Sequence, residues 1–451
     1  MAVLTPLFQW TGLTGFAFLF VLLPLFLVVH RLLPEQYRAG GMLGISLVYM
    51  AALQPLGALV MMGSVAVDYL AIRTMKRHDD NRAIRRASHA VAIGKSILLM
   101  GYALVGMART GVNPLLGIVV CALSGISMVD EMYRRTQPYE LDFLKVALYC
   151  CFFPRLFVGP LVTYEEFNRQ MLHPDWSLAK MLNGAYQLMV GAFKAAVLGA
   201  QLRAMYVDLA VDFRQQPSVL CAWLLLLVFA LAVYFLMSGY GDMAQGLALL
   251  FGYAIPKNFY YPYQARNVTD FFERFHSTAV TYIRRFLGYL PDKGTVRDCV
   301  KLLLTGGLLG LWFGLRLPNF LWGLYLSLFV LLEKYVYPRF LKVIPVLLGR
   351  VYGFLIVLSG MAILSADSGG GWLIHVKALF GLSGQGVAVY TDTLLYILAS
   401  NWVILLSGCF LATNLVDVTG RWISKTLPTV GKAGRLVLLV GLIAAFAALT
   451  I

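Results

Sequence analysis

The chain is a succession of apolar runs separated by short polar loops. A transmembrane helix needs about 20 mostly apolar residues, and roughly eleven runs are long enough to serve. These runs are Leu13–His30, Met42–Tyr69, Val91–Met107, Pro114–Met128, Ala185–Leu202, Leu220–Met237, Leu302–Trp312, Phe320–Tyr337, Val343–Leu364, Leu394–Ala412 and Arg435–Ile451. Leu144–Val162, Met243–Tyr253 and Trp372–Leu382 are shorter or broken by Gly and Pro, and we expect them to be re-entrant or interfacial.

The composition agrees with this pattern and excludes other classes of protein. Hydrophobic residues make up 60% of the chain and charged residues 13%, about half the charged fraction of soluble domains. Intrinsic disorder is excluded because the apolar content is far too high. The sequence therefore predicts an all-α polytopic membrane protein that forms a single membrane-embedded domain over residues 1–451.

The distribution of charge predicts an orientation. The chain carries 37 Lys and Arg against 22 Asp and Glu, a net charge of +15. Stretches 73–95, 266–301 and 421–435 are rich in Lys and Arg, so we expect them to face the cytoplasm. Stretches 203–218 and 365–393 are nearly balanced and fit the outer side. The basic residues are not interleaved with aromatic ones, so a nucleic-acid partner is set aside.

The cysteines do not indicate a metal site. Six cysteines lie mostly inside apolar runs, and no CxxC or Cys/His spacing typical of zinc occurs. We expect neither a disulfide framework nor a bound metal. Cys150 and Cys151 are most simply small buried hydrophobes.

The segment Val268–Leu290 has the pattern of an amphipathic helix. Apolar residues recur every three or four positions, and charged residues occupy the other side. Alone, such a helix lies at the membrane interface. His276 falls at the border of the apolar face and is expected to point into protein. A single histidine there is usually a packing residue, so a functional role depends on its neighbours.

Two other segments contain polar residues in apolar surroundings. Asp242 lies within an apolar run, where an ionisable group is costly and often functional. The alternative is a structural pair with a backbone amide or an arginine. The segment Phe152–Leu161 contains Pro, Gly and Arg155. It fits either a kinked helix pair or a re-entrant turn that lines a cavity.

Three motifs occur in a recognisable order. They are FFPRLFVGPLVTYEEF, then GYGDMAQGLALLFGYAIPKNFYYPYQARNVTDFFERFHSTAVTYIRRFL, then GGLLGLWFG. In order and spacing they resemble the membrane-bound O-acyltransferase family, in its bacterial branch, whose members acetylate alginate and cellulose or D-alanylate teichoic acids. The resemblance covers residues 114–337 and identifies them as the family-like core. It implies a ring of tilted helices, with re-entrant and interfacial helices, around a central funnel.

The resemblance also implies an activity and partners. An acyl thioester, either acyl-CoA or a phosphopantetheinyl acyl-carrier protein, would enter from the cytoplasm of a bacterium. The acyl group would pass across the inner membrane to a hydroxyl of a cell-envelope polysaccharide or similar acceptor. The thioester would be a substrate, and no bound cofactor is expected. Expected partners are membrane lipids, a carrier protein on the cytoplasmic face, and an extracytoplasmic transferase or export protein.

The family's functional residues can be placed on this sequence. His276 matches a histidine that the family retains, and Asp242 would support it. The family's best-known catalytic histidine lies in a Trp-His-Gly motif, which here reads Trp312-Phe313-Gly314. The resemblance assigns further positions to the substrate funnel: Phe153, Pro154, Arg155, Gly159, Pro160, Asn258 and Trp312.

Phe313 at this position allows two hypotheses about activity. A phenyl ring cannot accept a proton, and general-base catalysis is worth about 10²–10⁴ in rate. The chain is then either an active acyltransferase in which His276, with Asp242, acts as base, or a non-catalytic homologue. Such a homologue would keep the funnel as a scaffold or conduit for a carrier protein, lipid or polysaccharide partner. A secondary transporter is less favoured, because two symmetric halves with broken helices are not visible.

Overall fold

The computed structural model describes residues 15, 17–110, 116–134, 142–156, 159–172, 174, 176–287, 295–338, 343–366, 371–382 and 390–450. Over these residues the chain is helical, and its only β-type pairing is an isolated bridge between Phe259 and Phe275. The predicted all-α membrane fold is confirmed. Among the described residues, six helical segments are long and apolar enough to cross a membrane: Pro55–Arg77, Arg82–Gly106, Leu178–Gln215, Val219–Leu250, Val346–Leu364 and Asp392–Leu411. The larger count of roughly eleven spans stays a prediction.

The described residues form two compact units, which we name after their most informative buried side chains. The histidine unit comprises Gly191–Gly239 and Lys257–Leu442. The arginine unit comprises Gln9–Val190, Tyr240–Pro256 and the chain after Leu442.

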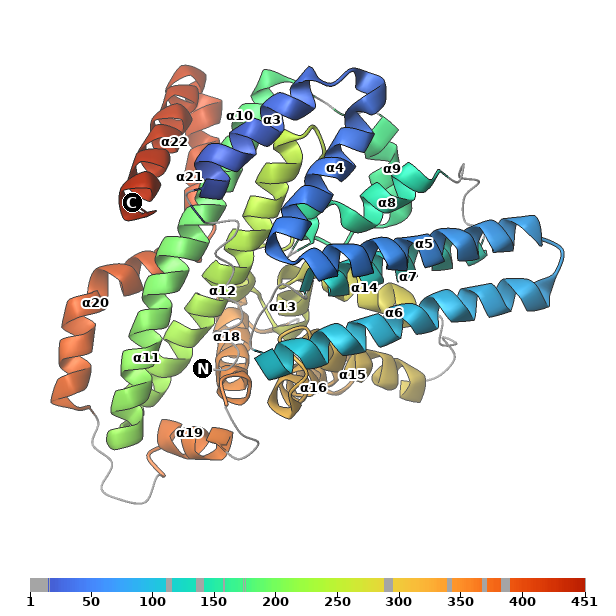
Figure 1. Cartoon of the computed structure of the whole chain (residues 1–451). Coiled ribbons are helices and arrows are strands. Elements are labelled where there is room, and N and C mark those ends of the chain that lie inside the picture. Colours follow the sequence, from blue (N-terminus) through green and yellow to red (C-terminus); the bar gives the residue numbers. More distant parts are fainter. Residues whose placement is uncertain are drawn as a thin grey trace. The chain divides into compact units, whose positions relative to one another are not determined.

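The arginine unit consists of helices connected by short loops. Its elements are η1 (Phe18–Leu22), α3 (Leu23–Leu32), α4 (Glu35–Leu53), α5 (Pro55–Arg77), α6 (Arg82–Thr110), α7 (Leu116–Arg134), α8 (Phe143–Cys151), η2 (Phe153–Arg155), α9 (Tyr164–Leu172) and most of α10 (Leu178–Ala192). Figure 1 shows α5 and α6 side by side. They are joined by an ion pair between Asp68 and Lys95, whose Oδ2 and Nζ are 2.8 Å apart.

The prediction of one membrane span over Met42–Tyr69 is wrong, because the helix is interrupted within this stretch. Helix α4 ends at Leu53 and α5 begins at Pro55, with Gln54 in an extended conformation between them. A residue that precedes proline is disfavoured in the helical region because the proline ring clashes with its backbone. One apolar run therefore forms two helices.

The histidine unit holds the part of the second motif that follows Pro256 and the whole of the third motif. Its elements are η3 (Phe193–Gly199), α11 (Ala200–Gln215), the first part of α12 (Val219–Leu250), η4 (Pro262–Gln264), α13 (Val268–Arg274), α14 (Ser277–Leu287), α15 (Thr295–Leu311), α16 (Leu317–Leu331), η5 (Leu332–Val336), α18 (Val346–Leu364), α19 (Gly371–Leu379), α20 (Asp392–Leu411), α21 (Leu415–Thr426) and most of α22 (Pro428–Thr450).

The prediction that Met243–Tyr253 is a re-entrant or interfacial segment is also wrong, since most of this segment continues α12. That helix runs without interruption to Leu250 and ends before Gly252, whose φ is +83°. Glycine adopts this left-handed conformation at no steric cost, so it ends the helix where the glycines upstream do not. The chain after Gly252 is non-helical as far as Tyr261.

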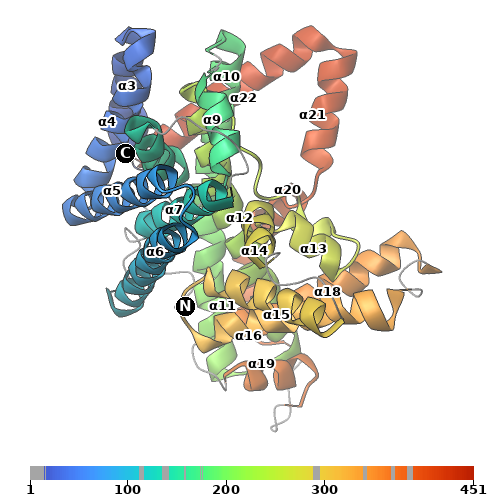
Figure 2. The ribbon, with the colours of Figure 1, turned by 90° about the vertical axis from the view of Figure 1, so that its right-hand side faces the viewer.

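A glycine seam holds α15 against α16, which lie side by side in Figure 2. A Cβ atom added to Gly323 would collide with the carbonyl oxygen of Gly306, and one added to Gly310 would collide with that of Asn319. Small residues allow helix backbones to approach this closely, as in many membrane helix pairs. The seam fixes the loop that follows α15, which contains Trp312 and Phe313.

We predict that Gly310→Ala lowers the thermal unfolding midpoint, since the new methyl meets backbone that cannot move aside. Overpacking of this kind costs about 1–3 kcal/mol. Gly420→Ala is the matched control, because nothing lies within 4 Å of its Cβ position and alanine favours helix. The midpoint of thermal unfolding in detergent is measured for both variants and for the wild type. Equal midpoints for the two would contradict a close α15–α16 contact.

Candidate functional site

The predicted helix over Val268–Leu290 is interrupted in its middle, which corrects the sequence interpretation. Helix α13 ends at Arg274 and α14 begins at Ser277. Between them Phe275 is extended, and His276 has a φ of +51°. A left-handed backbone is uncommon for a residue other than glycine, and it marks strain that the surrounding structure must hold in place.

A non-local backbone pairing causes the interruption. The amide of Tyr260 donates to the carbonyl of Arg274 at 2.9 Å, and the amide of Ser277 donates to the carbonyl of Asn258 at 2.9 Å. These bonds flank the bridge between Phe259 and Phe275. The carbonyl of Arg274 and the amide of Ser277, which would form hydrogen bonds within a continuous helix, bond to the preceding segment instead. The motif histidine is therefore placed by a segment that precedes it by almost twenty residues.

His276 is fully buried, as the sequence predicted for its orientation. Its ring lies 4.8 Å from the Trp312 ring and 5.6 Å from the Phe259 ring, measured between centroids. Neither ring nitrogen has a hydrogen-bond partner among the described residues. Burial lowers the pKa of His276 to about 3, since a charged imidazolium is poorly solvated there. The imidazole is thus neutral at physiological pH and has a free lone pair.

Phe313 is buried among other aromatic rings. Its ring centroid lies 5.5 Å from that of Trp322 and 6.2 Å from that of Phe275. The next residue, Gly314, has a φ of +123° and turns the chain toward α16. Aromatic pairs at these separations contribute packing energy beyond their buried area. Phe313 thus stabilises the turn Trp312-Phe313-Gly314 without offering a proton acceptor.

Polar atoms without partners gather around these rings. Oδ1 of Asn258 accepts from the backbone and hydroxyl of Thr278, but its Nδ2 has no partner in the part of the chain that the structure describes. Nδ2 of Asn319 donates to the carbonyl of Gly314 at 3.0 Å, but no described residue donates to its Oδ1. Nε1 of the fully buried Trp322 is also unpartnered among the described residues. Because buried polar atoms are nearly always satisfied, such a cluster indicates a place where a polar ligand completes the bonding.

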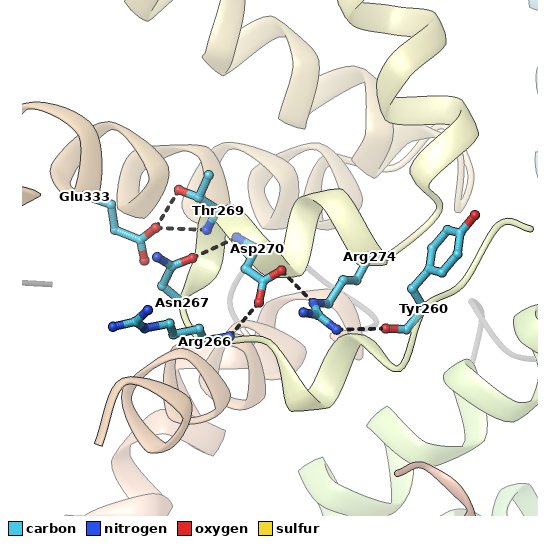
Figure 3. A network of polar contacts seen from close by, with 7 residues as sticks. All are labelled: Tyr260, Arg266, Asn267, Thr269, Asp270, Arg274 and Glu333. Atoms are coloured by element: carbon cyan, nitrogen blue, oxygen red, sulfur yellow. Dashed lines mark hydrogen bonds and ion pairs between the residues drawn. The ribbon is translucent and has the colours of Figure 1, made fainter. Parts of the chain in front are cut away.

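Glu333 holds the start of α13. This buried carboxylate, from η5, accepts from the amide of Val268 at 2.8 Å and from the amide and hydroxyl of Thr269 at 2.9 and 2.6 Å. Figure 3 shows the bonds to Thr269. The first amides of a helix have no partner within the helix, so a carboxylate there both satisfies them and meets the positive end of the helix dipole.

A second set of contacts joins both ends of α13 to the preceding loop (Figure 3). Oδ1 of Asn267 accepts from the amide of Asp270 at 2.8 Å. The Asp270 carboxylate in turn accepts from the amide of Arg266 at 2.8 Å and from Nε of Arg274 at 2.6 Å. Arg274 also donates to the carbonyl of Tyr260 at 3.4 Å. The network ties α13 to the segment that pairs with Phe275.

The first motif forms a turn in the arginine unit. Phe153, Pro154 and Arg155 make the single turn η2 directly after α8, and the chain is then non-helical until α9. Gly159 and Pro160 are buried beside it, and a Cβ on Gly159 would collide with the backbone of Arg155. This geometry favours a turn over a kinked helix pair. Residues 157–158, within the same motif, lie outside the described residues.

Arg155 is fully buried inside that turn. Its Nη2 donates to Oγ of Ser124 at 2.9 Å and to the carbonyl of Tyr149. The guanidinium lies over the Tyr149 ring, 4.3 Å from the centroid. Nε and Nη1 have no partner among the described residues.

Asp242 lies in α12, within the arginine unit, where it is buried. Its role as a supporting residue stays a prediction. Among the described residues, no group of three or more His, Cys, Asp or Glu side chains could hold a metal ion. The unpartnered atoms of Asn319 and Trp322 were not identified from the sequence, because nothing in the local pattern separates them from other α16 residues.

Known proteins resemble this chain in the same regions. The model of the membrane-bound O-acyltransferase family matches residues 127–350, a range that contains all three motifs. The chain belongs to the membrane-bound O-acyltransferase family. It is 28% identical to the probable alginate O-acetylase AlgI of Pseudomonas fluorescens over 374 residues, which are 78% of this chain and 72% of the relative.

Two relatives with other names also match. The peptidoglycan O-acetyltransferase of Helicobacter pylori is 33% identical over 192 residues, 40% of this chain and 36% of the relative. The teichoic acid D-alanyltransferase of Bacillus subtilis is 22% identical over 223 residues, 47% of this chain and 56% of the relative. These matches confirm the bacterial branch that the motifs indicated.

We predict that Glu333→Ala destabilises the protein, because the amides of Val268 and Thr269 then lose their buried acceptor. An unsatisfied buried group of this kind costs about 1–3 kcal/mol. The control is Glu273→Ala, which removes an exposed carboxylate from the same helix α13. Thermal unfolding compares the two. The assignment of Glu333 as the anchor of α13 is wrong if both variants unfold at the wild-type temperature.

Proposed function

We propose that the chain is an O-acyltransferase of the bacterial inner membrane that acts on a cell-envelope polysaccharide. Membership of the family supports acyl transfer, and the relatives named for alginate, peptidoglycan and teichoic acid support an envelope polymer as acceptor. The observation that carries the proposal is His276, a buried neutral imidazole with two unpartnered nitrogens beside Trp312.

The donor in this proposal is an acyl thioester presented from the cytoplasm, as acyl-CoA or as an acyl-carrier protein. Both donors carry phosphate groups, and the basic stretches 73–95 and 266–301 would attract them. An acidic carrier protein would be attracted by the same charge. A transferase or export protein on the outer side would be a further partner.

The proposed step is an attack by an acceptor hydroxyl on the thioester carbonyl. The new C–O bond forms as the C–S bond breaks, the hydroxyl proton goes to a nitrogen of His276, and His276 then gives that same proton to the leaving sulfur, which departs as a thiol. Unlike Phe313, neutral His276 has a lone pair that can receive the proton. Asn258 and Trp322 have free donors that would stabilise negative charge on the carbonyl oxygen.

A second candidate is favoured by the packing of Phe313. Its ring is enclosed by Phe275 and Trp322 at the family's catalytic position. A non-catalytic homologue would keep the same folded site without turnover. It would serve as a scaffold or conduit for a carrier protein, a lipid or a polysaccharide partner.

We predict that wild-type protein in nanodiscs releases thiol from at least one acyl-CoA or acyl-carrier thioester. His276→Gln should lower this rate by about 10²–10⁴, the usual worth of a general base. Gln36→Ala, which changes an exposed side chain of α4 outside the basic stretches, should leave the rate unchanged.

The same assay decides between the two candidates. A wild-type protein that is silent, together with thiol release by Phe313→His, would support the non-catalytic homologue. Release that is equal in wild type and His276→Gln would exclude His276 as the base.

A further inference from the structure

Two arginines and a buried histidine surround Trp176 in the arginine unit. The guanidinium carbons of Arg31 and Arg38 lie 5.9 and 5.3 Å from the centroid of the Trp176 ring. The ring of His30 lies 4.9 Å from the same ring, measured between centroids. These side chains come from the end of α3, the start of α4 and the chain just before α10. We call the four residues the Trp176 cluster.

The neighbouring backbone holds the cluster in place. A Cβ atom added to Gly252 would lie 3.0 Å from Cε2 of Trp176, so the indole packs closely on the turn that follows α12. Nε of Arg38 donates to the carbonyl of Leu33 at 3.2 Å, which fixes this side chain to the turn between α3 and α4. The cluster therefore has a preformed geometry.

The cluster carries positive charge that the described residues barely balance. Nη1 of Arg38 pairs with the Glu35 carboxylate at 3.5 Å, but that side chain is 88% exposed, and exposed ion pairs are weak. Arg31 is exposed, and no described residue accepts a hydrogen bond from it. Two guanidiniums beside one indole thus suit an anionic ligand.

Two buried polar atoms of the cluster also need partners. Nε1 of Trp176 and Nε2 of His30 have none among the residues that the structure describes, and His30 is only 1% exposed. Buried polar atoms are nearly always satisfied. An indole N–H can only donate, so it needs an acceptor such as a phosphate oxygen. An imidazole nitrogen donates or accepts according to tautomer, and a hydroxyl pairs with either form.

The helix surfaces beside the cluster are apolar and exposed. They consist of Leu25, Val28, Val29 and Leu32 on α3, and Leu178 and Leu182 on α10. Exposed apolar surface of this extent marks contact with a membrane or partner, and in a membrane-spanning chain lipid tails cover it. Because Arg31 lies within the last turn of this surface on α3, an anion that reaches Arg31 has room for acyl chains along the helix.

The predicted topology places the cluster at the cytoplasmic leaflet. The helical segment Leu178–Gln215 is long enough to cross the membrane, and its end belongs to stretch 203–218, which the charge pattern assigns to the outer side. Its start, directly after Trp176, then lies on the cytoplasmic side. Tryptophan is common at this depth, and basic pockets between helices on this side bind anionic headgroups.

We propose that the Trp176 cluster binds the headgroup of an anionic phospholipid with free hydroxyls, of the phosphatidylglycerol type. The phosphate accepts from Arg31 and from Nε1 of Trp176, a headgroup hydroxyl bonds Nε2 of His30, and the acyl chains lie along α3. A choline headgroup is disfavoured, because its positive charge would approach two guanidiniums.

Native mass spectrometry of the whole protein in uncharged detergent tests this assignment by measuring the dissociation constant of the first lipid bound. Short-chain phosphatidylglycerol should bind about tenfold more tightly than phosphatidylcholine with the same chains. Arg31→Gln should weaken phosphatidylglycerol about fivefold, the usual effect of one basic residue near an anionic surface. Trp176→Phe keeps a ring but loses the N–H, and should weaken it about tenfold.

Arg82→Gln is the matched control, since it removes the same charge from an exposed arginine at the start of α6 and should leave the constant unchanged. Equal binding of the two lipids, or equal losses in Arg31→Gln and Arg82→Gln, would overturn the proposal. So would equally tight binding of glycerophosphoglycerol, which has the headgroup without acyl chains, or displacement of the lipid by coenzyme A. Unfolding midpoints show that the variants are folded.

Discussion

The geometry of the candidate site depends on one backbone pairing, between the segment Asn258–Tyr260 and the break in the amphipathic helix. Because Tyr260 and Ser277 bond across this pairing, the helix cannot continue through Phe275, and His276 takes a left-handed conformation in the interior. Glu333 fixes the other end of α13 by accepting from its first amides. The result is a fully buried histidine whose ring nitrogens have no hydrogen-bond partner among the residues that the structure describes. Such an arrangement is costly for folding alone, and strain of this kind is concentrated at functional sites.

Phe313 changes what this site can do more than how it folds. Its ring is part of an aromatic cluster with Phe275 and Trp322. The close contact between α15 and α16 at the glycine seam fixes the backbone of the loop that contains Phe313. The sequence resemblance matches Phe313 to the family's catalytic histidine, so the prediction places a hydrophobe where that match expects a proton acceptor. The remaining proton acceptor in the cluster is His276. The acyltransferase hypothesis and the scaffold hypothesis differ in whether the imidazole of His276 can act as the general base.

Much of the fold, and part of the site, followed from the sequence. Hydrophobic runs predicted the helices because burial in lipid requires them, and the motif order predicted the family. The break after Arg274 was missed because the apolar periodicity continues in register through Phe271, Phe275 and Ala279, so the local pattern is that of an unbroken helix. Its cause is a non-local backbone bond, which periodicity cannot reveal. The atoms of Asn319 and Trp322 that lack a partner among the described residues could likewise be found only once distant segments are folded together.

We propose that His276 is a neutral base whose ring nitrogens form hydrogen bonds only when a ligand binds. Nitrogen NMR of the protein with ¹⁵N-labelled histidine, in nanodiscs, measures this directly, with His276→Gln to assign the signal. We expect a neutral ring at pH 5, well below the ordinary histidine pKa of about 6.5, and a change in its nitrogen shifts when a thioether analogue of the acyl donor is added with a hydroxyl acceptor. A ring that is protonated at pH 5, or whose shifts do not respond to these ligands, would contradict it.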